Sequence, residues 1–409
     1  MKTLGSFITF RKGKPPNASS QGTLPILTPE YLRTGEKGDL AETTGREVIL
    51  RGGEIILLWD GSNAGEVFRA KSGVLSSTMV VLSFDPNEVT PDYLFYDLKH
   101  FEPILKGKTA GSGIPHVDKE ILLSHEILER EPGEQDVVAN VLKSFDQMIE
   151  ATEATIAKHR RIKTGLVHDL LSRGVDGNGR LRDPATDAFV QSSLGRIPAE
   201  WSVPTLSECT LRITVGLATS VTKYYRDKGV PIIRNLNIRD GFLDDSELLY
   251  LDPAFAGKFA TKSVKYRDVI TCRTGANVGD TCLVPQRLAN AQTFTTLITT
   301  TKKEKLVPEF LVDYLASEQG QRELRNVLVG AGKDNLNAGQ LREVRVPLPD
   351  PTEQECIHSI IQSASESINQ QELSRDKLVA LKRGLMEDLV TGRVSVAPLL
   401  STMQEPLSL

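Results

Sequence analysis

Cysteine is scarce in this chain, and its few thiols lack the spacing of a metal site. The 409 residues include four cysteines, Cys209, Cys272, Cys282 and Cys356, which all lie in the second half without a Cys-x-x-Cys pair. The six histidines are scattered and form neither a His-x3-His nor a His-Glu-x2-His motif. We therefore expect buried, reduced thiols, and neither a disulfide framework nor a structural zinc site.

Long apolar runs are absent as well. No run of about eighteen apolar residues occurs, the length that suggests a transmembrane helix. The chain starts with Met1-Lys2-Thr3 and continues into a short stretch that polar residues interrupt, which is unlike a signal peptide. The sequence therefore predicts a cytoplasmic protein without a membrane partner.

The common catalytic motifs are missing too. Gly107-Lys108-Thr109 resembles the end of a P-loop, but Glu102 stands where the first glycine of that motif belongs. Gly111-Ser112-Gly113 lacks the strand–turn–helix setting of a nucleophile elbow. No glycine-rich loop for a dinucleotide or a methyl donor is found. We therefore expect a non-catalytic chain that carries no cofactor and no metal.

The charge is balanced instead of strongly basic. The chain has 49 Lys and Arg against 53 Asp and Glu, a net charge of -4. Residues 1–131 hold 15 basic and 18 acidic groups, whereas residues 194–350 hold 21 basic and 18 acidic groups. Binding to DNA depends on how basic groups cluster on one face. Net charge therefore neither supports nor excludes DNA, and the second region is the better electrostatic candidate.

The chain repeats itself. Gly61-Ser62-Asn63-Ala64-Gly65 recurs as Gly275-Ala276-Asn277-Val278-Gly279, and Glu134-Gln135 recurs as Glu353-Gln354. The order of the matches is kept at an offset of 214 to 219 residues, which is far longer than a solenoid repeat. This indicates two copies of a module in which one globular domain precedes one long helix. A protein of this kind is expected to act on something with two related halves.

Each copy begins with a segment that is typical of a mixed α/β domain. Short apolar runs bounded by glycine predict strands in the first copy at 48–50, 54–59 and 77–82. The matching strands in the second copy are predicted at 269–272 and 294–299. A proline in the first turn predicts helices at 91–105 and from Pro308. The expected fold is therefore α/β (mixed α+β), with two globular domains in tandem.

The two long helices have a coiled-coil pattern. In the first, the 3-4 series is Val138, Val141, Phe145, Met148, Thr152, Thr155, His159, Ile162, Leu166 and Asp169. In the second, it is Ile357, Ile360, Ala364, Ser367, Gln371, Ser374, Leu378, Leu381, Leu385 and Asp388. The helices end alike, with residues 165–170 matching 384–389. We expect helices of about 60 Å that pair as an antiparallel coiled coil about a pseudo-twofold axis.

A segment rich in turn residues separates the two copies. Its last residues include Trp201, which is expected to hold the second domain against a helix end. The expected divisions are a first domain at 1–131, a first long helix at 132–175, a linker and entry segment at 176–203, a second domain at 204–350, a second long helix at 351–394 and a tail at 395–409.

Several motifs follow one another in a fixed order. They are Leu-Gly-Arg-Ile-Pro-Ala-Glu-Trp at 194–201, Gly-Val-Pro-Ile-Ile-Arg at 229–234 with Asp-Gly at 240–241 and a weaker echo at 22–27, Pro-Thr-Glu-Gln at 351–354, and the helix ends Leu-Leu-Ser-Arg-Gly-Val and Leu-Val-Thr-Gly-Arg-Val. In this order, over nearly the whole chain, they resemble the specificity (S) subunit of type I restriction–modification systems.

The resemblance implies a non-catalytic, sequence-reading subunit of a methyltransferase and restriction complex. Each globular domain would be a target recognition domain that reads one half of a bipartite target, with the gap set by the paired helices. The implied partners are double-stranded DNA, two modification (methyltransferase) subunits and restriction subunits. The alternative from the residues alone is a pseudo-symmetric scaffold that docks two partner subunits without reading DNA.

The first copy departs from the family pattern at its entry. It has no counterpart of the 194–201 motif, because Met1-Lys2-Thr3-Leu4 already aligns with Pro204-Thr205-Leu206. Two explanations stand side by side. Either the first domain is shortened at its entry, or the segment from Val394 onward supplies part of that surface.

Candidate DNA-contacting residues lie in polar loops, because Arg and Lys suit guanine edges or phosphates and Tyr suits bases or backbone. In the first domain they are Arg11, Lys12, Lys14, Asn17, Asn63 and His116. In the second they are Thr219, Lys223, Tyr224, Tyr225, Arg226, Asn277, Lys333 and Asn335. Glycine beside Asn63 and Asn277 lets the backbone approach a ligand closely. An ordinary turn asparagine explains these two residues equally well, and a solvated turn explains the basic loop at 11–17.

Overall fold

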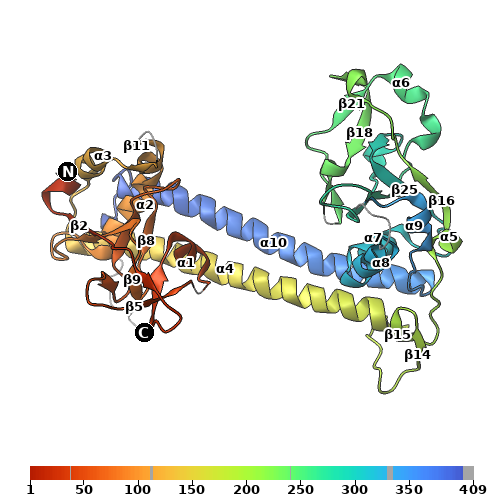
Figure 1. Ribbon diagram of the computed structural model, residues 1–409, viewed down its shortest axis with the longest axis horizontal. Helices are drawn as coiled ribbons and strands as arrows, with labels where there is room; N and C mark the ends of the chain where they lie inside the picture. Colours follow the sequence, from red (N-terminus) through yellow and green to blue (C-terminus); the bar gives the residue numbers. More distant parts are fainter. Residues whose placement is uncertain (37, 111–113, 240, 329–334, 399–409) are drawn as a thin grey trace. The chain divides into compact units, whose positions relative to one another are not determined.

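The computed structural model describes residues 1–36, 38–110, 114–239, 241–328 and 335–398 (Figure 1). The chain divides into two compact units, unit 1 with Met1–Ala154 and Glu372–Leu409, and unit 2 with Thr155–Gln371. Helices α4 (Pro132–Arg173) and α10 (Pro351–Val390) both continue from one unit into the other. Within the described ranges, no helix has the length and apolar character needed to cross a membrane.

Unit 1 contains two main sheets. The order of the four-stranded sheet is β2 (Thr9–Lys12), β10 (Met79–Ser83), β7 (Ile55–Leu58) and β8 (Val67–Arg69). The order of the five-stranded sheet is β3 (Asn17–Ala18), β5 (Leu40–Glu42), β4 (Leu24–Leu27), β9 (Gly73–Leu75) and β6 (Ile49–Leu50). All neighbours are antiparallel except β4 and β9, which are parallel.

Unit 2 repeats this topology. Its first sheet has the order β16 (Thr210–Val215), β25 (Thr296–Thr301), β22 (Val269–Cys272) and β23 (Thr281–Leu283). Its second sheet has the order β17 (Tyr225–Arg226), β21 (Leu249–Leu251), β18 (Val230–Arg234) and β24 (Gln292–Phe294). The parallel pair recurs as β18 and β24. The two glycine-proline segments at 22–27 and 229–234 therefore form matching strands, which confirms the predicted repeat.

The strands predicted at 48–50 and 54–59 are β6 and β7, and a turn separates them as expected. The two strands belong to different sheets. The cause is the turn between them, where Gly52 and Gly53 have φ of 107° and 91°. The Glu54 carboxylate accepts the N–H of Arg51 at 2.9 Å and of Gly52 at 2.8 Å. This turn directs the chain out of one sheet and into the other.

Each unit has one main core that joins its first sheet to the shorter helices of the domain and to both long helices. In unit 1 the helix is α2 (Pro91–Gly107), with Pro91 in its first turn. Its core includes Leu57, Val80, Leu94, Leu98, Val138, Leu142 and Leu389. In unit 2 the helices are α7 (Pro308–Ala316), α8 (Glu318–Leu328) and α9 (Ala338–Glu343). Its core includes Ile213, Phe310, Leu311, Leu341, Leu170, Leu171 and Ile357.

The long helices pair antiparallel within each unit, as expected. In unit 1 the residue Arg130, just before α4, donates to the carbonyl of Leu389 near the end of α10, at 2.6 Å. In unit 2 the N–H of Val175, just after α4, donates to Glu353 in the first turn of α10, at 2.9 Å. Trp201 lies at the same end, 5% exposed, and donates to Glu353 at 3.1 Å. The predicted role of Trp201 is therefore confirmed.

The register of the helix pairing differs from the prediction. The covered positions on α4 are Val138, Leu142, Phe145, Ile149, Thr152, Ile156, His159, Lys163, Leu166 and Leu170. Those on α10 are Ile357, Ile361, Ala364, Ile368, Gln371, Arg375, Leu378, Lys382, Leu385 and Leu389. In each predicted series, every second residue thus lies one position before the residue that is covered. Among these misplaced residues, the exposed ones are Met148, Ile162, Ser367, Ser374 and Leu381. The 3-4 spacing itself is confirmed.

The error is one of phase. The prediction counted three and then four residues from Val138 and from Ile357, whereas the covered positions follow a count of four and then three. Ile162 and Leu381 therefore lie outside, and Lys163 and Lys382 are the half-buried residues. Lys382 pairs with Asp146, and Lys163 lies close enough to the Asp313 carboxyl to act on its pKa. A lysine buries its aliphatic stem while its ammonium group reaches a carboxylate. The apolar neighbours are left on the outside.

The segment after α10 packs into the core of unit 1. Val396 is fully buried in the core of that unit, and the N–H of Val394 donates to the carbonyl of Asp388 at 3.2 Å. The C-terminal segment therefore contributes to the packing of the first domain, as far as Pro398. The rest of the expected tail, 399–409, lies outside the described residues.

Candidate nucleic-acid interface

In unit 1 the structure brings the glycine turn and one of the candidate loops together. The turn at 61–65 joins β7 to β8, and it carries the exposed side chain of Asn63. Asp60, just before the turn, forms an antiparallel bridge with His116, and the N–H of Gly61 donates to the carbonyl of Pro115 at 2.9 Å. Two segments that are more than fifty residues apart in sequence thus form one edge of the domain.

Unit 2 has the same arrangement at matching positions. Thr274, just before the turn at 275–279, forms an antiparallel bridge with Asn335. Arg273 donates from Nε and Nη2 to the side-chain oxygen of Asn335 at 3.2 and 3.1 Å. The segments at His116 and Asn335 therefore have a common backbone framework. We call these two places the turn–loop sites.

The two turn asparagines differ in their surroundings. Asn277 is part-buried and donates to the backbone carbonyl of Asn235 at 3.0 Å, whereas Asn63 is exposed. The Asn277 side chain thus fixes the turn to a neighbouring segment, as a structural turn residue does. The Asn63 side chain is directed to the surface, where it is open to a ligand.

Cations and aromatic rings lie next to the turn–loop site of unit 1. Lys12, on β2, pairs with Asp60 at 2.6 Å and keeps half of its side chain exposed. Phe10 on the same strand packs against Trp59, with ring centroids 4.9 Å apart, and Lys119 lies 5.5 Å from the Phe10 centroid. The sequence reasoning missed Phe10, Trp59 and Lys119. The signal was present in Phe10-Arg11-Lys12, an aromatic residue directly before two cations.

The remaining candidates of the first domain are all exposed. Arg11 is on β2, Lys14 follows that strand, and Asn17 begins β3. β3 is an outer strand of the five-stranded sheet, whereas β2 belongs to the four-stranded sheet. Asn17 and Arg11 therefore lie on different sheets. The basic loop is therefore spread over two sheets.

The loop before β18 in unit 2 has mixed roles. Tyr224 stacks on Phe255, with ring centroids 3.7 Å apart, and Tyr225 is half-buried in the same apolar cluster. Arg226 pairs with Asp252 at 3.1 Å. The two tyrosines thus contribute mainly to packing, and the arginine is held by a carboxylate.

Two other residues of this loop face solvent. Thr219 and Lys223 are exposed, and the ammonium of Lys223 lies 5.1 Å from the Tyr224 ring centroid. They leave a hydroxyl and a cation available for a ligand. The last candidate, Lys333, lies outside the described residues.

The thiols are free, as the sequence predicts. Cys209, Cys272 and Cys282 are buried and Cys356 is partly buried, with no disulfide among these four residues. Burial raises the pKa of Cys272 to about 12, so its thiol is unreactive at neutral pH. In the ranges that the structure describes, no group of three or more His, Cys, Asp or Glu could hold a metal ion.

The repeated Glu-Gln motif fixes each domain to its long helix. Gln135 and Gln354 are buried, and their side-chain oxygens accept the N–H groups of Thr90 at 2.7 Å and Val307 at 2.8 Å. Each also donates to the carbonyl two residues before its helix, at 3.0 and 2.8 Å. The motif therefore connects the start of a long helix to the start of α2 in unit 1 and of α7 in unit 2.

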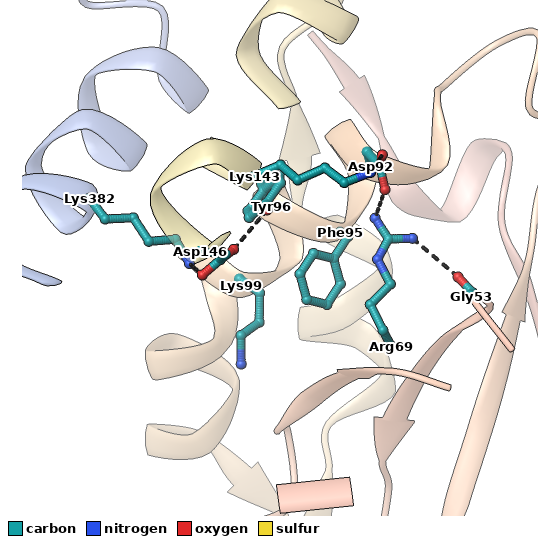
Figure 2. A pocket seen from close by; sticks show the side chains of 9 residues that line it. All are labelled: Gly53, Arg69, Asp92, Phe95, Tyr96, Lys99, Lys143, Asp146 and Lys382. Carbon is teal, nitrogen blue, oxygen red and sulfur yellow. Dashed lines mark hydrogen bonds and ion pairs between the residues drawn. The ribbon is translucent and has the colours of Figure 1, made fainter. Parts of the chain in front are cut away.

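An open pocket of about 550 Å³ lies beside α2 in unit 1 (Figure 2). It is lined by Gly53, Arg69, Asp92, Phe95, Tyr96, Lys99, Lys143, Asp146 and Lys382. Figure 2 shows that the charged groups face one another: Tyr96 donates to Asp146 at 2.7 Å, and Lys382 pairs with the same carboxylate. Burial, with Asp146 as the next cause, raises the pKa of Tyr96. These contacts join α2 to both long helices.

Unit 2 makes the equivalent junction with other residues. Asp313 on α7 accepts from His358 on α10 at 2.7 Å, and Glu309 pairs with Arg267. By the repeat, Glu309 matches Asp92 and Asp313 matches Tyr96. The hydrogen bond to Asp313 raises the pKa of His358, and burial raises the pKa of Asp313. The pocket of unit 1 is therefore an anchoring junction, while the turn–loop sites are the better interface for a nucleic acid.

The chain matches a known family over most of its length. The model of the type I restriction modification DNA specificity domain matches residues 1–158 and 216–375. The specificity subunit of the type I restriction enzyme MjaVIII from Methanocaldococcus jannaschii is 30% identical over 410 residues, which cover 96% of this chain and 92% of that protein. The EcoBI specificity subunit from Escherichia coli is 21% identical over 381 residues, or 86% of this chain and 79% of that one.

Solved structures show the same fold. The S subunit of a type I system from M. genitalium matches with a TM-score of 0.58 and 15% identity over 95% of both chains. A second match comes from structural work on complex assembly and conformational transition of the type I system. It has a TM-score of 0.58 and 14% identity, over 95% of this chain and 99% of that one. Together with the tandem domains and their turn–loop sites, the family match shows that this chain belongs to the DNA specificity subunits of type I restriction–modification systems.

Proposed function

We propose that this chain reads a bipartite DNA sequence, with each globular domain recognising one half. The observation that carries the proposal is the repeated turn–loop site, in which Asp60 meets His116 and Thr274 meets Asn335. The backbone framework is shared and the side chains differ. Two readers of different half-site sequences require such a combination, because base edges are read by side chains.

Within this proposal the exposed candidates have separate roles. Lys12, Asn63 and His116 meet at the turn–loop site of unit 1 and are assigned to base or phosphate contacts there. Asn335, with Arg273, takes the corresponding place in unit 2. The other proposed contacts to DNA come from the exposed residues Arg11, Lys14, Asn17, Thr219, Lys223 and Arg226. Tyr224, Tyr225 and Asn277 are assigned to holding these loops in shape, and Lys333 is kept as a candidate from the sequence.

The long helices set the gap between the half-sites in this proposal, and the chemistry comes from partner subunits. Two modification subunits bind one chain, because the repeat presents equivalent surfaces twice, and restriction subunits join that complex. The chain has no catalytic role of its own and works in the cytoplasm, where the DNA is. Support comes from the antiparallel pairing of α4 and α10 within each unit, and from the buried Gln135 and Gln354 that fix the domains to them.

Genome-wide mapping of methylated motifs, in cells with and without this gene, tests the proposal. The expected result is the loss of one motif with two defined halves and an unspecified gap. Unchanged methylation in cells that contain the cognate modification subunit would overturn it. A salt-dependent mobility shift of this chain on duplex DNA tests the scaffold alternative, since DNA binding through phosphates weakens as salt increases and a pure scaffold shows no shift.

A further inference from the structure

Each turn–loop site has a highly exposed apolar side chain beside it. Among the described residues, and apart from Met1, the three most exposed large apolar side chains are those of Ile114, Leu211 and Leu236, at 73%, 71% and 61%. Single exposed apolar residues are normal on protein surfaces, so exposure alone carries no argument. The positions do, because Ile114 adjoins the turn–loop site of unit 1 and Leu236 adjoins that of unit 2.

The backbone around Ile114 is attached to the glycine turn of unit 1. The next residue is Pro115, whose carbonyl accepts the N–H of Gly61 at 2.9 Å, and His116 follows it at the start of β12 (His116–Val117). A residue that precedes proline is largely restricted to extended backbone. Ile114 therefore has a defined place on the same edge of the domain as the exposed Asn63.

Leu236 is attached to the glycine turn of unit 2 in another way. It is the middle residue of the short 3-10 helix η3 (Asn235–Asn237), which follows β18. Asn235 donates from its side chain to the carbonyl of Thr274 at 3.3 Å, and its own carbonyl accepts from Asn277 at 3.0 Å. Asn237, on the other side, is only 4% exposed. Both neighbours of Leu236 are thus fixed, and the leucine side chain is left exposed beside the turn.

The third residue, Leu211, is exposed for a local reason. The pairing of β16 with β25 shifts register between Thr210 and Arg212, so Leu211 is the extra residue of a bulge. It lies where the start of β16 pairs with the end of β25, whereas the other end of β25 pairs with Cys272, just before the turn at 275–279. Leu211 is therefore away from the turn–loop site, which makes it a matched control.

The polar side chains at the two sites indicate which part of DNA the apolar ones face. Lys12 and Asn63 in unit 1, and Arg273 and Asn335 in unit 2, are of the types that read purine edges in the major groove. In that groove the apolar feature of a base pair is the C5-methyl group of thymine, and apolar side chains contact it. A hydrogen-bonding side chain cannot recognise a methyl group. One apolar residue among several polar ones is therefore suited to a half-site that contains both purine contacts and a thymine.

We propose that Ile114 and Leu236 each read one thymine of the target by packing against its C5-methyl group, Ile114 in one half and Leu236 in the other. This inference rests on the proposed function and specifies a base that each half contains. Insertion of the side chain as a wedge between stacked bases is less suited, since unstacking costs free energy and both residues lie among side chains that read base edges. The two residues come from different segments, so the thymine is expected at different places within the two halves.

The test removes single methyl groups from the DNA. In duplexes that carry the mapped target, each thymine on either strand is replaced in turn by deoxyuridine, which lacks only the C5-methyl group. For the assembled complex with the parent chain, we expect one position in each half at which the affinity falls by about fourfold. Ile114→Ala should abolish this response in one half only, and Leu236→Ala in the other half only. Each variant should bind the unmodified target about fourfold more weakly than the parent.

Leu211→Ala is the control, and it should bind like the parent and keep both responses to deoxyuridine. A half-site made only of G·C pairs, or a response to deoxyuridine that persists in the alanine variants, would overturn the inference. So would a rise in 2-aminopurine fluorescence that depends on Ile114 or Leu236, because it would identify a wedge. Weaker binding of a modification subunit by the alanine variants, with unchanged affinity for DNA, would assign the two residues to a protein contact instead. If the parent complex showed no preference for the mapped target over an unrelated duplex, the proposed function itself would fail.

Discussion

The two units are built alike. They differ most at the start of the long helix, which is α4 in unit 1 and α10 in unit 2. In unit 2, Glu353 is 7% exposed, accepts from Trp201 and Val175, and pairs with Arg182. In unit 1, the matching Glu134 is half-buried and has no such side-chain contact within the described part of the chain. The neighbouring Gln135 and Gln354 make the same hydrogen bonds in both units.

This contrast separates what the repeat needs from what one copy has added. Both units connect a domain to a long helix, at α2 in unit 1 and at α7 in unit 2, and the two glutamines do so by the same geometry. In unit 2 the segment at 176–203 brings Arg182 and Trp201 to Glu353, which is buried. The turn–loop sites differ as well, as His116 and Asn335 show. The repeat is therefore kept where the domains join the helices.

The largest effect is expected at Glu353. The substitution Glu353→Gln leaves the Arg182 guanidinium, which is 11% exposed, with only Glu200 as a carboxylate partner, at 3.2 Å. Breaking a buried pair in this way costs about 3 kcal/mol of the free energy of unfolding. Glu134→Gln is the matched control and is expected to cost less than about 0.5 kcal/mol. Urea unfolding followed by tryptophan fluorescence separates the units, since Trp59 is in unit 1 and Trp201 in unit 2.

Equal losses from these two substitutions would contradict the contrast between the units. A Trp59→Phe background isolates the signal of Trp201, and a Trp201→Phe background isolates that of Trp59. Refolding controls in both backgrounds show whether each transition is reversible. Only then do the fitted free energies apply to single units.

The next effect is expected at the shared glutamines. Gln354→Leu leaves the N–H of Val307 and the carbonyl of Pro349 without their partner, and Gln135→Leu does the same to Thr90 in unit 1. Unsatisfied buried groups cost about 2 kcal/mol for each substitution. Urea unfolding followed by tryptophan fluorescence measures both losses of stability. Losses that differ strongly between the units would show that the two junctions are energetically unlike, in spite of their common geometry.

Much of the fold follows from the sequence, because long-range repetition fixes the architecture. The tandem domains, the antiparallel helices, the matching strands at 22–27 and 229–234 and the role of Trp201 were all predictable from order and spacing. The helix register was predicted in the wrong phase, because the series was counted three and then four residues from Val138 and from Ile357. The half-buried positions of Lys163 and Lys382, each near a carboxylate from a distant segment, could not be read from the spacing of one helix.

The candidate interface was predictable only in part. The glycine turns pointed to Asn63 and Asn277, but sequence could not show that Asn277 donates to Asn235 while Asn63 is exposed. Arg273 was missed because its role depends on the bridge between Thr274 and Asn335. Tyr224 was chosen for its chemistry, although its ring stacks on Phe255. Side-chain roles of this kind depend on contacts between residues far apart in the chain.

A smaller effect is expected at the turn–loop sites, and it separates the two readers. Lys12→Ala removes an exposed cation from the turn–loop site of unit 1, and Arg273→Ala removes the cation that donates to Asn335 in unit 2. Each is expected to weaken DNA binding of the assembled complex by about fivefold, and a lost phosphate contact lowers the salt slope by about 1. Mobility shifts on duplexes with one half-site altered measure this. If Lys12 contacts a phosphate, Lys12→Ala should weaken binding equally on all duplexes. If Lys12 contacts a base, the substitution should weaken binding only on duplexes with an intact first half-site.

The smallest effect is a pH dependence confined to unit 2. The hydrogen bond to Asp313 raises the pKa of His358, with Glu309 contributing and Arg267 opposing. A folded-state pKa above the unfolded value means that the folded unit holds the proton more tightly. The stabilisation is therefore complete below about pH 6.5 and is lost as the pH rises through the raised pKa. Unit 1 has Tyr96 and Asp146 at this junction, with the tyrosine pKa raised further above neutrality.

Comparison of the parent chain with His358→Gln, by urea unfolding read from Trp201 between about pH 6 and pH 9, measures this contribution. The parent is expected to be more stable than the variant at the acid end, with the difference shrinking as the pH rises. Ala139 holds the place of His358 in unit 1, so the transition read from Trp59 should respond equally in both proteins. A difference that stayed constant over this range would show that His358 contributes by packing alone, and the junctions of the two units would then differ in shape and not in their response to protons.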